Sequence, residues 1–135
     1  MILEILNKPS KISDDMIDSI VNHADQILDL EELEELQIVF NKEDGDTCGY
    51  FDGIGEEEDG VAVIEINSKK SLEEIIKTIF HEIVHVQQVL HGFFCNEEKT
   101  WYGDYFGDLN YDEKPWEIDA FSKEGMLYSS WKTCA

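Results

Sequence analysis

The chain is 135 residues long, the size of one domain, and its 42% hydrophobic content is typical of a folded globular protein. Its charge is strongly one-sided, because 31 Asp and Glu face 10 basic residues and the net charge is −21. This balance argues against binding to nucleic acid and against docking on anionic membranes, since both need clustered basic side chains.

The N-terminal residues do not have the pattern of a signal peptide, since no basic segment precedes an apolar one. No apolar run reaches the roughly 18 residues of a membrane-spanning helix. The three cysteines, Cys48, Cys95 and Cys134, are odd in number and have no CxxC spacing, which favours reduced thiols. We therefore expect a cytoplasmic protein.

Three segments in the first part of the chain have the patterns of secondary structure. Ile2 to Leu6 is expected to be a strand or a packed N-terminal arm. Ser13 to Leu28 predicts a helix, because a serine can cap its start and apolar residues follow at helical spacing. Leu36 to Phe40 is a short apolar run that the turn sequence KEDGD connects to Cys48 to Gly53, so this pair predicts a β-hairpin.

The middle of the chain predicts one strand and one long helix. The acidic loop at Glu56 to Asp59 is expected to be solvated. It leads into Val61 to Asn67, whose β-branched residues make the clearest strand. The sequence SLEE at Ser71 to Glu74 is a capping box that predicts the start of a long helix, and Gly92 is well placed to end that helix.

The last part of the chain predicts a loop and a final helix. The loop, residues 96–114, is rich in Tyr, Gly and Asp, and Pro115 then takes the favoured first position of the helix. The side chains expected to pack inward from this helix are Trp116, Ala120, Phe121, Leu127, Tyr128 and Trp131. Together these elements predict an α+β fold, in which a small antiparallel or mixed sheet packs on the long helix and a C-terminal helix follows.

The long helix contains the motif HExxH, formed by His81, Glu82 and His85. Residues four apart on an α-helix are separated by about 400° of rotation and about 6 Å of rise, so both imidazoles can reach one zinc ion. Glu82 is turned away from its neighbour His81 by about 100°, which suits a general base rather than a ligand. A chain of this composition contains about 0.015 such motifs by chance, so the motif is specific.

A catalytic zinc site needs a third protein ligand. Glu117, near the start of the final helix, is the leading candidate. His91 completes the HExxHxxGxxH spacing of metzincins except that Gln88 replaces the glycine, and an unbroken helix would carry His91 away from the metal. Asp119 or another acid is the remaining alternative.

The sequence HEIVHVQQ, followed by an aromatic-rich loop and by PWEIDAF, resembles the small gluzincin-type metallopeptidases of phages and bacteria. It is more distantly similar to the peptidase-like domain of the ImmA/IrrE regulators. The resemblance covers about residues 60–125. It implies one minimal zincin-like domain over residues 1–135, with a catalytic core at 56–131 and an unassigned N-terminal helix and strands at 1–55.

The resemblance also implies roles for individual residues. His81, His85 and Glu117 would hold Zn²⁺, Glu82 would be the general base, and the strand Val61 to Asn67 would line the cleft. The implied function is that of a zinc-dependent metallopeptidase, which hydrolyses peptide bonds in a peptide or protein substrate by means of a metal-activated water. The acidic charge of the chain favours a basic substrate through electrostatic steering.

Two kinds of supporting residue are expected around such a site. A tyrosine is the natural donor to the oxyanion that forms during hydrolysis. The sequence does not choose among the candidates in the loop, which are Tyr102, Tyr105 and Tyr111. Each ligating imidazole should also donate its far N–H to an acceptor. The candidates for this role are Asp112, Glu113 and Asp119.

The alternative function is that of a non-catalytic acidic interaction or regulatory protein with a structural or vestigial zinc site. Such a protein would use its acidic surface to bind a basic partner or to mimic DNA. Glu82 separates the two interpretations, because a purely structural site has no need of a carboxylate at that position. The sequence does not predict the oligomeric state.

Overall fold

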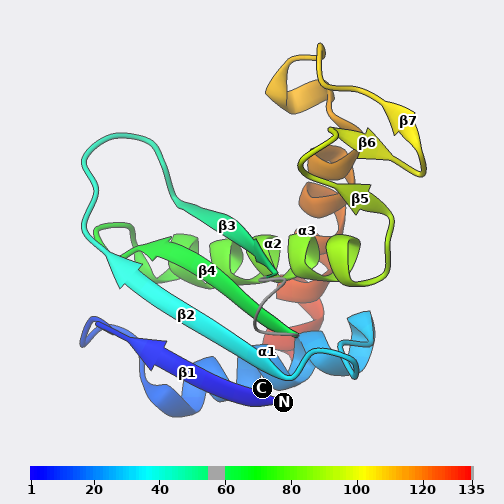
Figure 1. Ribbon diagram of the computed structural model, residues 1–135. Helices are drawn as coiled ribbons and strands as arrows, with labels where there is room; N and C mark the ends of the chain where they lie inside the picture. Colours follow the sequence, from blue (N-terminus) through cyan, green and yellow to red (C-terminus); the bar gives the residue numbers. More distant parts are fainter. Residues whose placement is uncertain (55–59, 135) are drawn as a thin grey trace.

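A four-stranded mixed sheet is the main layer of the computed structural model, which describes residues 1–54 and 60–134 (Figure 1). Its strands stand in the order β1 (Ile2–Leu6), β2 (Glu35–Asn41), β4 (Val61–Asn67) and β3 (Gly49–Ile54). The first three are parallel to one another, and β3 runs antiparallel to β4 at the edge. The acidic loop expected at Glu56 to Asp59 lies outside the described residues.

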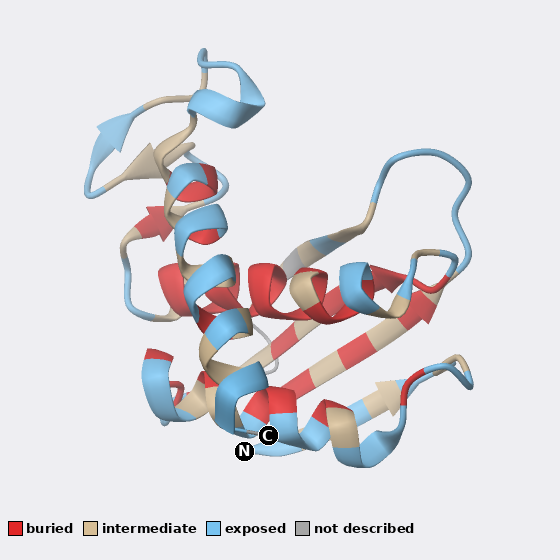
Figure 2. Ribbon diagram, turned by 180° about the vertical axis from the view of Figure 1, so that it is seen from behind, coloured by how far each residue is buried: buried red, intermediate tan, exposed pale blue. Residues whose placement is uncertain are grey.

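Three α-helices among the described residues complete the fold. Helices α1 (Asp14–Leu28) and α2 (Leu72–Leu90) pack on one face of the sheet, and α3 (Pro115–Cys134) crosses α2 on the side away from the sheet (Figure 1, Figure 2). Between α2 and α3 the chain forms a small antiparallel sheet and one turn of 3-10 helix. These elements are β5 (Phe94–Cys95), β6 (Thr100–Trp101), β7 (Asp104–Tyr105) and η1 (Tyr111–Glu113). The predicted α+β fold is confirmed.

The hydrophobic core lies between the main sheet and the helices. Alternate residues of β2 and β4 are buried, as expected for strands with one covered face. On α1, Ser13 caps the helix by accepting a hydrogen bond from the Met16 backbone N–H at 3.1 Å, and the apolar stripe that follows is buried. Fully buried members of the core include Leu36, Ile38, Ile64, Ile66, Ile79 and Ile83.

The prediction of a hairpin between β2 and β3 is wrong. Strand β4 lies between these two strands and pairs with both. The connection from β2 to β3 is held by the buried Asn67 at the end of β4, whose amide donates to the backbone oxygens of Thr47 at 2.8 Å and Glu43 at 3.1 Å. A turn sequence fixes a local change of direction only. The partner of β2 is set by the burial of its apolar residues in a mostly parallel sheet, which a local pattern does not show.

Both predicted ends of α2 are confirmed. Ser71 Oγ accepts a hydrogen bond from the Glu74 backbone N–H at 3.2 Å, which caps the start of the helix. Gly92 has a φ of +79°, and the N–H of the next residue, Phe93, donates to the Gln88 carbonyl at 2.8 Å. This left-handed glycine and the backward hydrogen bond end the helix. The helix therefore continues unbroken past the HExxH motif to Leu90.

Helix α3 begins at Pro115 as predicted, but the prediction that six of its side chains pack inward is wrong for one of them. Most of the expected residues are buried or packed against the core, namely Trp116, Ala120, Leu127, Tyr128 and Trp131. Phe121 is instead 51% exposed, because its position on α3 directs it into the space beside α2, where its ring centroid lies 4.5 Å from that of His81. The strands within 96–114 were not predicted, since two-residue strands are too short to show a period.

Cys48, Cys95 and Cys134 are all free. Within residues 1–54 and 60–134, none of the helices is long and apolar enough to cross a membrane.

Gly49 sets how closely β3 approaches α2. A Cβ atom there would lie 2.6 Å from Thr78 Cγ2 and 2.7 Å from the Glu65 carbonyl oxygen. We expect Gly49→Ala to lower the free energy of unfolding by about 1–3 kcal/mol, because strand and helix must move apart.

The matched control is Gly125→Ala on α3. Nothing lies within 4 Å of a Cβ added at Gly125, so we expect a gain of about 1 kcal/mol from helix propensity. Urea unfolding of both variants tests the pair. A Gly49→Ala protein as stable as the wild type would contradict the close approach of β3 to α2.

Candidate metal centre

Three of the predicted ligands meet where α3 crosses α2. His81 and His85 lie one turn apart on α2, are both buried, and have ring centroids 4.9 Å apart. The first turn of α3 brings Glu117 against them, so that its Oε1 atom lies 3.0 Å from His81 Nε2 and 3.0 Å from His85 Nε2. One possible ligand atom from each residue lies within 4.8 Å of the other two.

The far nitrogens of both imidazoles are also engaged. His81 Nδ1 lies 3.0 Å from Glu124 Oε1, and His85 Nδ1 lies 2.8 Å from Gln88 Oε1. A carboxylate only accepts hydrogen bonds, and the Gln88 amide must turn its oxygen to His85 because its nitrogen donates to the Trp116 carbonyl at 2.9 Å. Both Nδ1 atoms therefore carry a proton, and in the neutral rings both Nε2 atoms present a lone pair toward the centre.

This arrangement concentrates negative charge in a buried place. Two nitrogen lone pairs and a carboxylate oxygen converge without a compensating basic side chain, since Lys or Arg is absent from the contacts of Glu117 among the described residues. A buried site of this kind needs protons or a cation to be stable. The donor set is the one that zinc takes in catalytic sites, with two imidazoles and a carboxylate.

In the metal-free protein, protonation of the two histidines supplies the positive charge that this buried site needs. Burial lowers the pKa of His81, but hydrogen bonds to Glu117 and Glu124 outweigh it and raise the pKa to about 9. Burial lowers the pKa of His85, but the hydrogen bond to Glu117 and the charge of its carboxylate raise the pKa by more, so the pKa is raised overall. Burial raises the pKa of Glu117, but hydrogen bonds from the two imidazoles outweigh it and lower the pKa to about 2. The site thus favours positive charge opposite an ionised carboxylate.

We expect the stability of the metal-free protein to fall as the pH rises from 6.5 to about 9. His81 has a higher pKa in the folded chain than its ordinary value of 6.5, so its stabilising contribution is complete below pH 6.5 and is lost as the pH rises through about 9. Glu117 has a lowered pKa, so its contribution is present above pH 4.5 and is lost as the pH falls through about 2.

Zinc should reverse the trend at alkaline pH, because metal and protons compete for the same nitrogens. Thermal unfolding across this pH range, with chelator or with zinc, tests the expectation. A metal-free protein whose melting temperature rises between pH 6.5 and 9 would contradict it.

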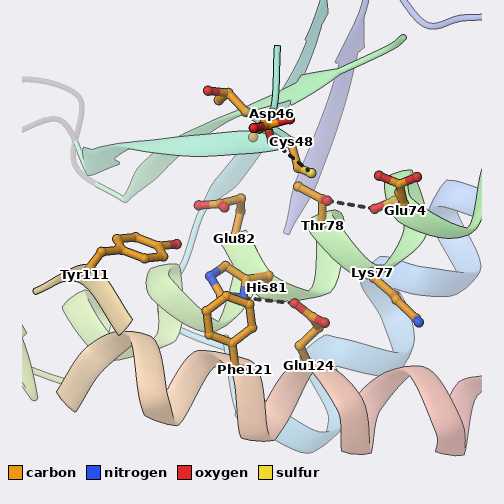
Figure 3. Close-up of a pocket in the computed structure, with 12 residues that line it drawn as sticks. Asp46, Cys48, Glu74, Lys77, Thr78, His81, Glu82, Tyr111, Phe121 and Glu124 are labelled. Carbon is orange, nitrogen blue, oxygen red and sulfur yellow. Dashed lines mark hydrogen bonds and ion pairs between the residues drawn. The ribbon is translucent and has the colours of Figure 1, made fainter. Parts of the chain in front are cut away.

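Glu82 lies beside this centre without belonging to it. Its side chain is only 6% exposed and faces the cavity next to His81 (Figure 3). None of the described residues forms a hydrogen bond with its carboxylate. Burial raises the pKa of Glu82, against the opposing influence of protonated His85 and His81. A desolvated carboxylate with a raised pKa is suited to take up and release a proton.

The other proposed third ligands lie apart from the centre. His91 is the C-terminal cap of α2, is exposed, and contacts the Asp29 carbonyl oxygen through Nε2 at 2.7 Å. Asp119 accepts a hydrogen bond from Gln88 at 2.9 Å and pairs with Lys123 at 3.1 Å. Because α2 is unbroken through Gln88, the helix carries His91 away from the other two histidines.

Of the three candidate tyrosines, only Tyr111 lies at the centre. It lines the cavities on both sides of Glu82, and its hydroxyl points toward the HExxH motif (Figure 3). Tyr111 is 59% exposed as a whole residue, but partial burial of its phenol and the carboxylate of Glu117 raise its pKa, which keeps the hydroxyl protonated as a donor. Tyr102 stacks on Phe93 with centroids 5.1 Å apart, and Tyr105 is exposed on the small sheet.

The expectation that β4 lines the cleft is wrong. The cavities on the two sides of Glu82 are lined by Gly49, Tyr50 and Phe51 of β3 and by the connection before it, and no residue of β4 contributes. The reason is the strand order, since β3 lies between β4 and the cleft. The hairpin prediction paired β3 with β2, so it did not place β3 next to β4 at the edge of the sheet.

The acceptors for the two imidazoles were missed. Glu124 and Gln88 take this role. Asp112 and Glu113 lie outside these contacts, and Asp119 accepts from Gln88 and not from a histidine. Helical spacing could have found both acceptors. Gln88 follows His85 by three residues and so lies on the same helix face, and Glu124 follows Glu117 by two turns of α3.

We expect Glu124→Ala to weaken zinc binding by about 10- to 100-fold, because His81 loses the acceptor that fixes its ring and tautomer. Glu124→Gln should recover most of the affinity, since an amide oxygen can still accept from Nδ1. Glu98→Ala removes an exposed acid elsewhere and serves as the control. Competition with a chromogenic zinc chelator measures the affinities. Equal affinities for all four proteins would contradict the role of Glu124.

The sequence matches no protein-family model and no curated protein. Four side chains therefore carry the functional assignment, namely His81, His85 and Glu117 of the centre and Glu82 beside it. These residues come from two helices that the sequence separates by 24 residues, between Leu90 and Pro115.

Proposed function

We propose that this protein is a zinc-dependent metallopeptidase. One observation carries the proposal, namely that His81, His85 and Glu117 converge in a buried site while Glu82 faces the adjoining cavity. Three nitrogen and oxygen ligands leave a coordination position open, as in catalytic rather than structural zinc sites. A structural site would need no buried carboxylate in the place of Glu82.

In this proposal the three ligands hold Zn²⁺, which supplies Lewis acidity toward the substrate carbonyl and toward water. Glu82 accepts the proton of the attacking water and returns it to the leaving nitrogen. The hydroxyl of Tyr111 donates to the oxyanion as charge develops. Gln88 and Glu124 keep the two imidazoles in the tautomer that presents Nε2.

The position of β3 supports a peptide as the substrate. It is the last strand of the main sheet among the described residues, and it borders both cavities beside Glu82. Extended peptides bind to such edge strands by adding a further strand. A peptide bound along β3 would pass the centre with its carbonyl groups near Glu82. The three free cysteines support a reducing, cytoplasmic setting for the reaction.

Zinc content and peptide cleavage test the proposal together. Elemental analysis of purified protein should give one zinc per chain. The zinc-loaded protein should cleave members of a complex peptide mixture, as detected by mass spectrometry. A chelator should stop the cleavage, and added zinc should restore it. Failure of the zinc-loaded protein to cleave any peptide or protein in such mixtures would count against a peptidase.

A further inference from the structure

A cavity of about 590 Å³ opens beside Glu82 (Figure 3). It lies between the first half of α2, the connection that leads into β3, and α3. Its volume is within the range of sites that hold small ligands, so it has room for a long side chain. Close to Glu82 its lining includes Phe121 and the methyl-bearing Thr78, which give an apolar surface on either side of His81.

The same cavity is acidic at its outer end. Asp46, from the connection before β3, and Glu74, from the first turn of α2, lie there on the side away from Tyr111 (Figure 3). Both residues are exposed to solvent. Glu74 Oε1 accepts a hydrogen bond from Ser71 Oγ at 3.1 Å, and a carboxylate oxygen can accept more than one hydrogen bond, so a cationic group that enters from solvent can still bind Glu74. A third carboxylate, Glu124, lies deeper and is held by His81.

The one lysine of the described lining does not neutralise these acids. Lys77 Nζ lies 3.2 Å from Glu73 Oε1, outside the cavity, and 5.0 Å from the centre of the Tyr128 ring. Its side chain extends away from Asp46 (Figure 3). The outer end of the lining therefore presents two carboxylates without a paired lysine of its own. Lys70 lies outside this lining, where its Nζ atom donates to the Gly45 carbonyl at 2.9 Å.

The cavity on the other side of Glu82 has a different character. Aromatic rings of Phe51, Phe94 and Trp116 line it, and Lys99 is its charged residue apart from the carboxylates of the centre. The acidic end is thus a local feature of one side of the cleft and not a general result of the net charge of −21.

Glu82 connects the acidic cavity to the reaction. It is more than nine-tenths buried, it faces this cavity, and it has no hydrogen-bonded partner within the part of the chain that the structure describes. A side chain that fills the cavity therefore belongs to a residue beside the bond on which Glu82 acts.

We propose, on the basis of the peptidase function proposed above, that this cavity binds a Lys or Arg side chain next to the scissile bond. The aliphatic part of such a side chain packs against Phe121 and Thr78, and its cationic end reaches Asp46 and Glu74. Long basic side chains have this division into an apolar stem and a charged head.

Cleavage of matched peptides tests the assignment. Short blocked peptides share one sequence and carry Lys, Gln or Glu at one position on either side of the scissile bond. We expect kcat/KM for the Lys peptide to exceed that for the Gln peptide by about tenfold, and the Glu peptide to be poorest. Asp46→Asn/Glu74→Gln should bring the Lys-to-Gln ratio close to one. The amide at position 74 can still cap α2, so the fold is kept.

The control is Glu31→Gln/Glu32→Gln, which removes the same charge from an exposed site elsewhere and should keep the wild-type ratio. A ratio near one in the wild type, or a Lys preference kept by Asp46→Asn/Glu74→Gln, would overturn the assignment.

A binding measurement separates this inference from the peptidase function. The same peptides are titrated against zinc-loaded Glu82→Gln, where no turnover is needed, and against that variant with Asp46→Asn/Glu74→Gln added. Tighter binding of the Lys peptide, lost on removal of the two acids, supports the cavity even if the wild type cleaves nothing. Equal binding of all three peptides, or no binding, overturns it even in an active peptidase.

Discussion

Glu82→Gln is expected to lower kcat/KM for peptide hydrolysis by about 10²- to 10⁴-fold while the protein keeps its zinc. Glutamine has the size of glutamate but cannot take a proton from the attacking water. Because Glu82 lies outside the three converging ligand atoms, its replacement should leave the zinc content at one per chain. The loss should therefore be in kcat, with substrate binding largely kept.

The matched control for this variant is Glu31→Gln, which changes one exposed carboxylate away from the centre. Assays use the best peptide from the cleavage screen, with zinc measured on the same samples. Activity of Glu82→Gln equal to that of the control would show that Glu82 is not the general base. In that case the acidic interaction protein would become the better interpretation.

Removal of zinc is expected to lower the melting temperature by roughly 10–20 °C. A ligand present at about 1,000 times its dissociation constant stabilises the folded state by about 4 kcal/mol. In this protein the effect has a structural cause. Glu117 joins α3 to α2 at the centre, while Ala120 and Leu127 of α3 belong to the hydrophobic core. Loss of the metal is therefore expected to loosen a helix on which the core depends.

Two alanine variants make this prediction specific. Glu117→Ala should lose zinc, and its melting temperature should no longer respond to chelator. His91→Ala should behave as the wild type, because His91 contacts the Asp29 carbonyl oxygen and not the centre. Differential scanning calorimetry with matched elemental analysis tests both. A wild type that does not respond to chelator, or a Glu117→Ala protein that still does, would contradict the proposed ligand set.

Features that depend on short stretches of chain were predictable. The cap at Ser71, the end of α2 at Gly92 and the start of α3 at Pro115 each depend on a few neighbouring residues. The common face of His81 and His85 follows from helix geometry alone. The unbroken course of α2 past Gln88 was likewise expected, because that segment contains no glycine before position 92.

Other features depended on contacts between distant segments. The order of β2, β4 and β3 reflects which strands bury apolar surface together, and a turn sequence does not encode that choice. The exposure of Phe121 and the selection of Tyr111 from three tyrosines follow from where α3 crosses α2. Helical periodicity therefore predicts neither of these features.

By itself the sequence determined the α+β class, the three helices and the HExxH face, because these depend on propensities and spacings within single elements. Only the tertiary structure decided which residues complete the centre. Glu117 meets the two histidines, and Glu124 holds His81, because α3 packs across α2. Contacts between helices far apart in the chain are fixed by packing of the whole core, which no local pattern records.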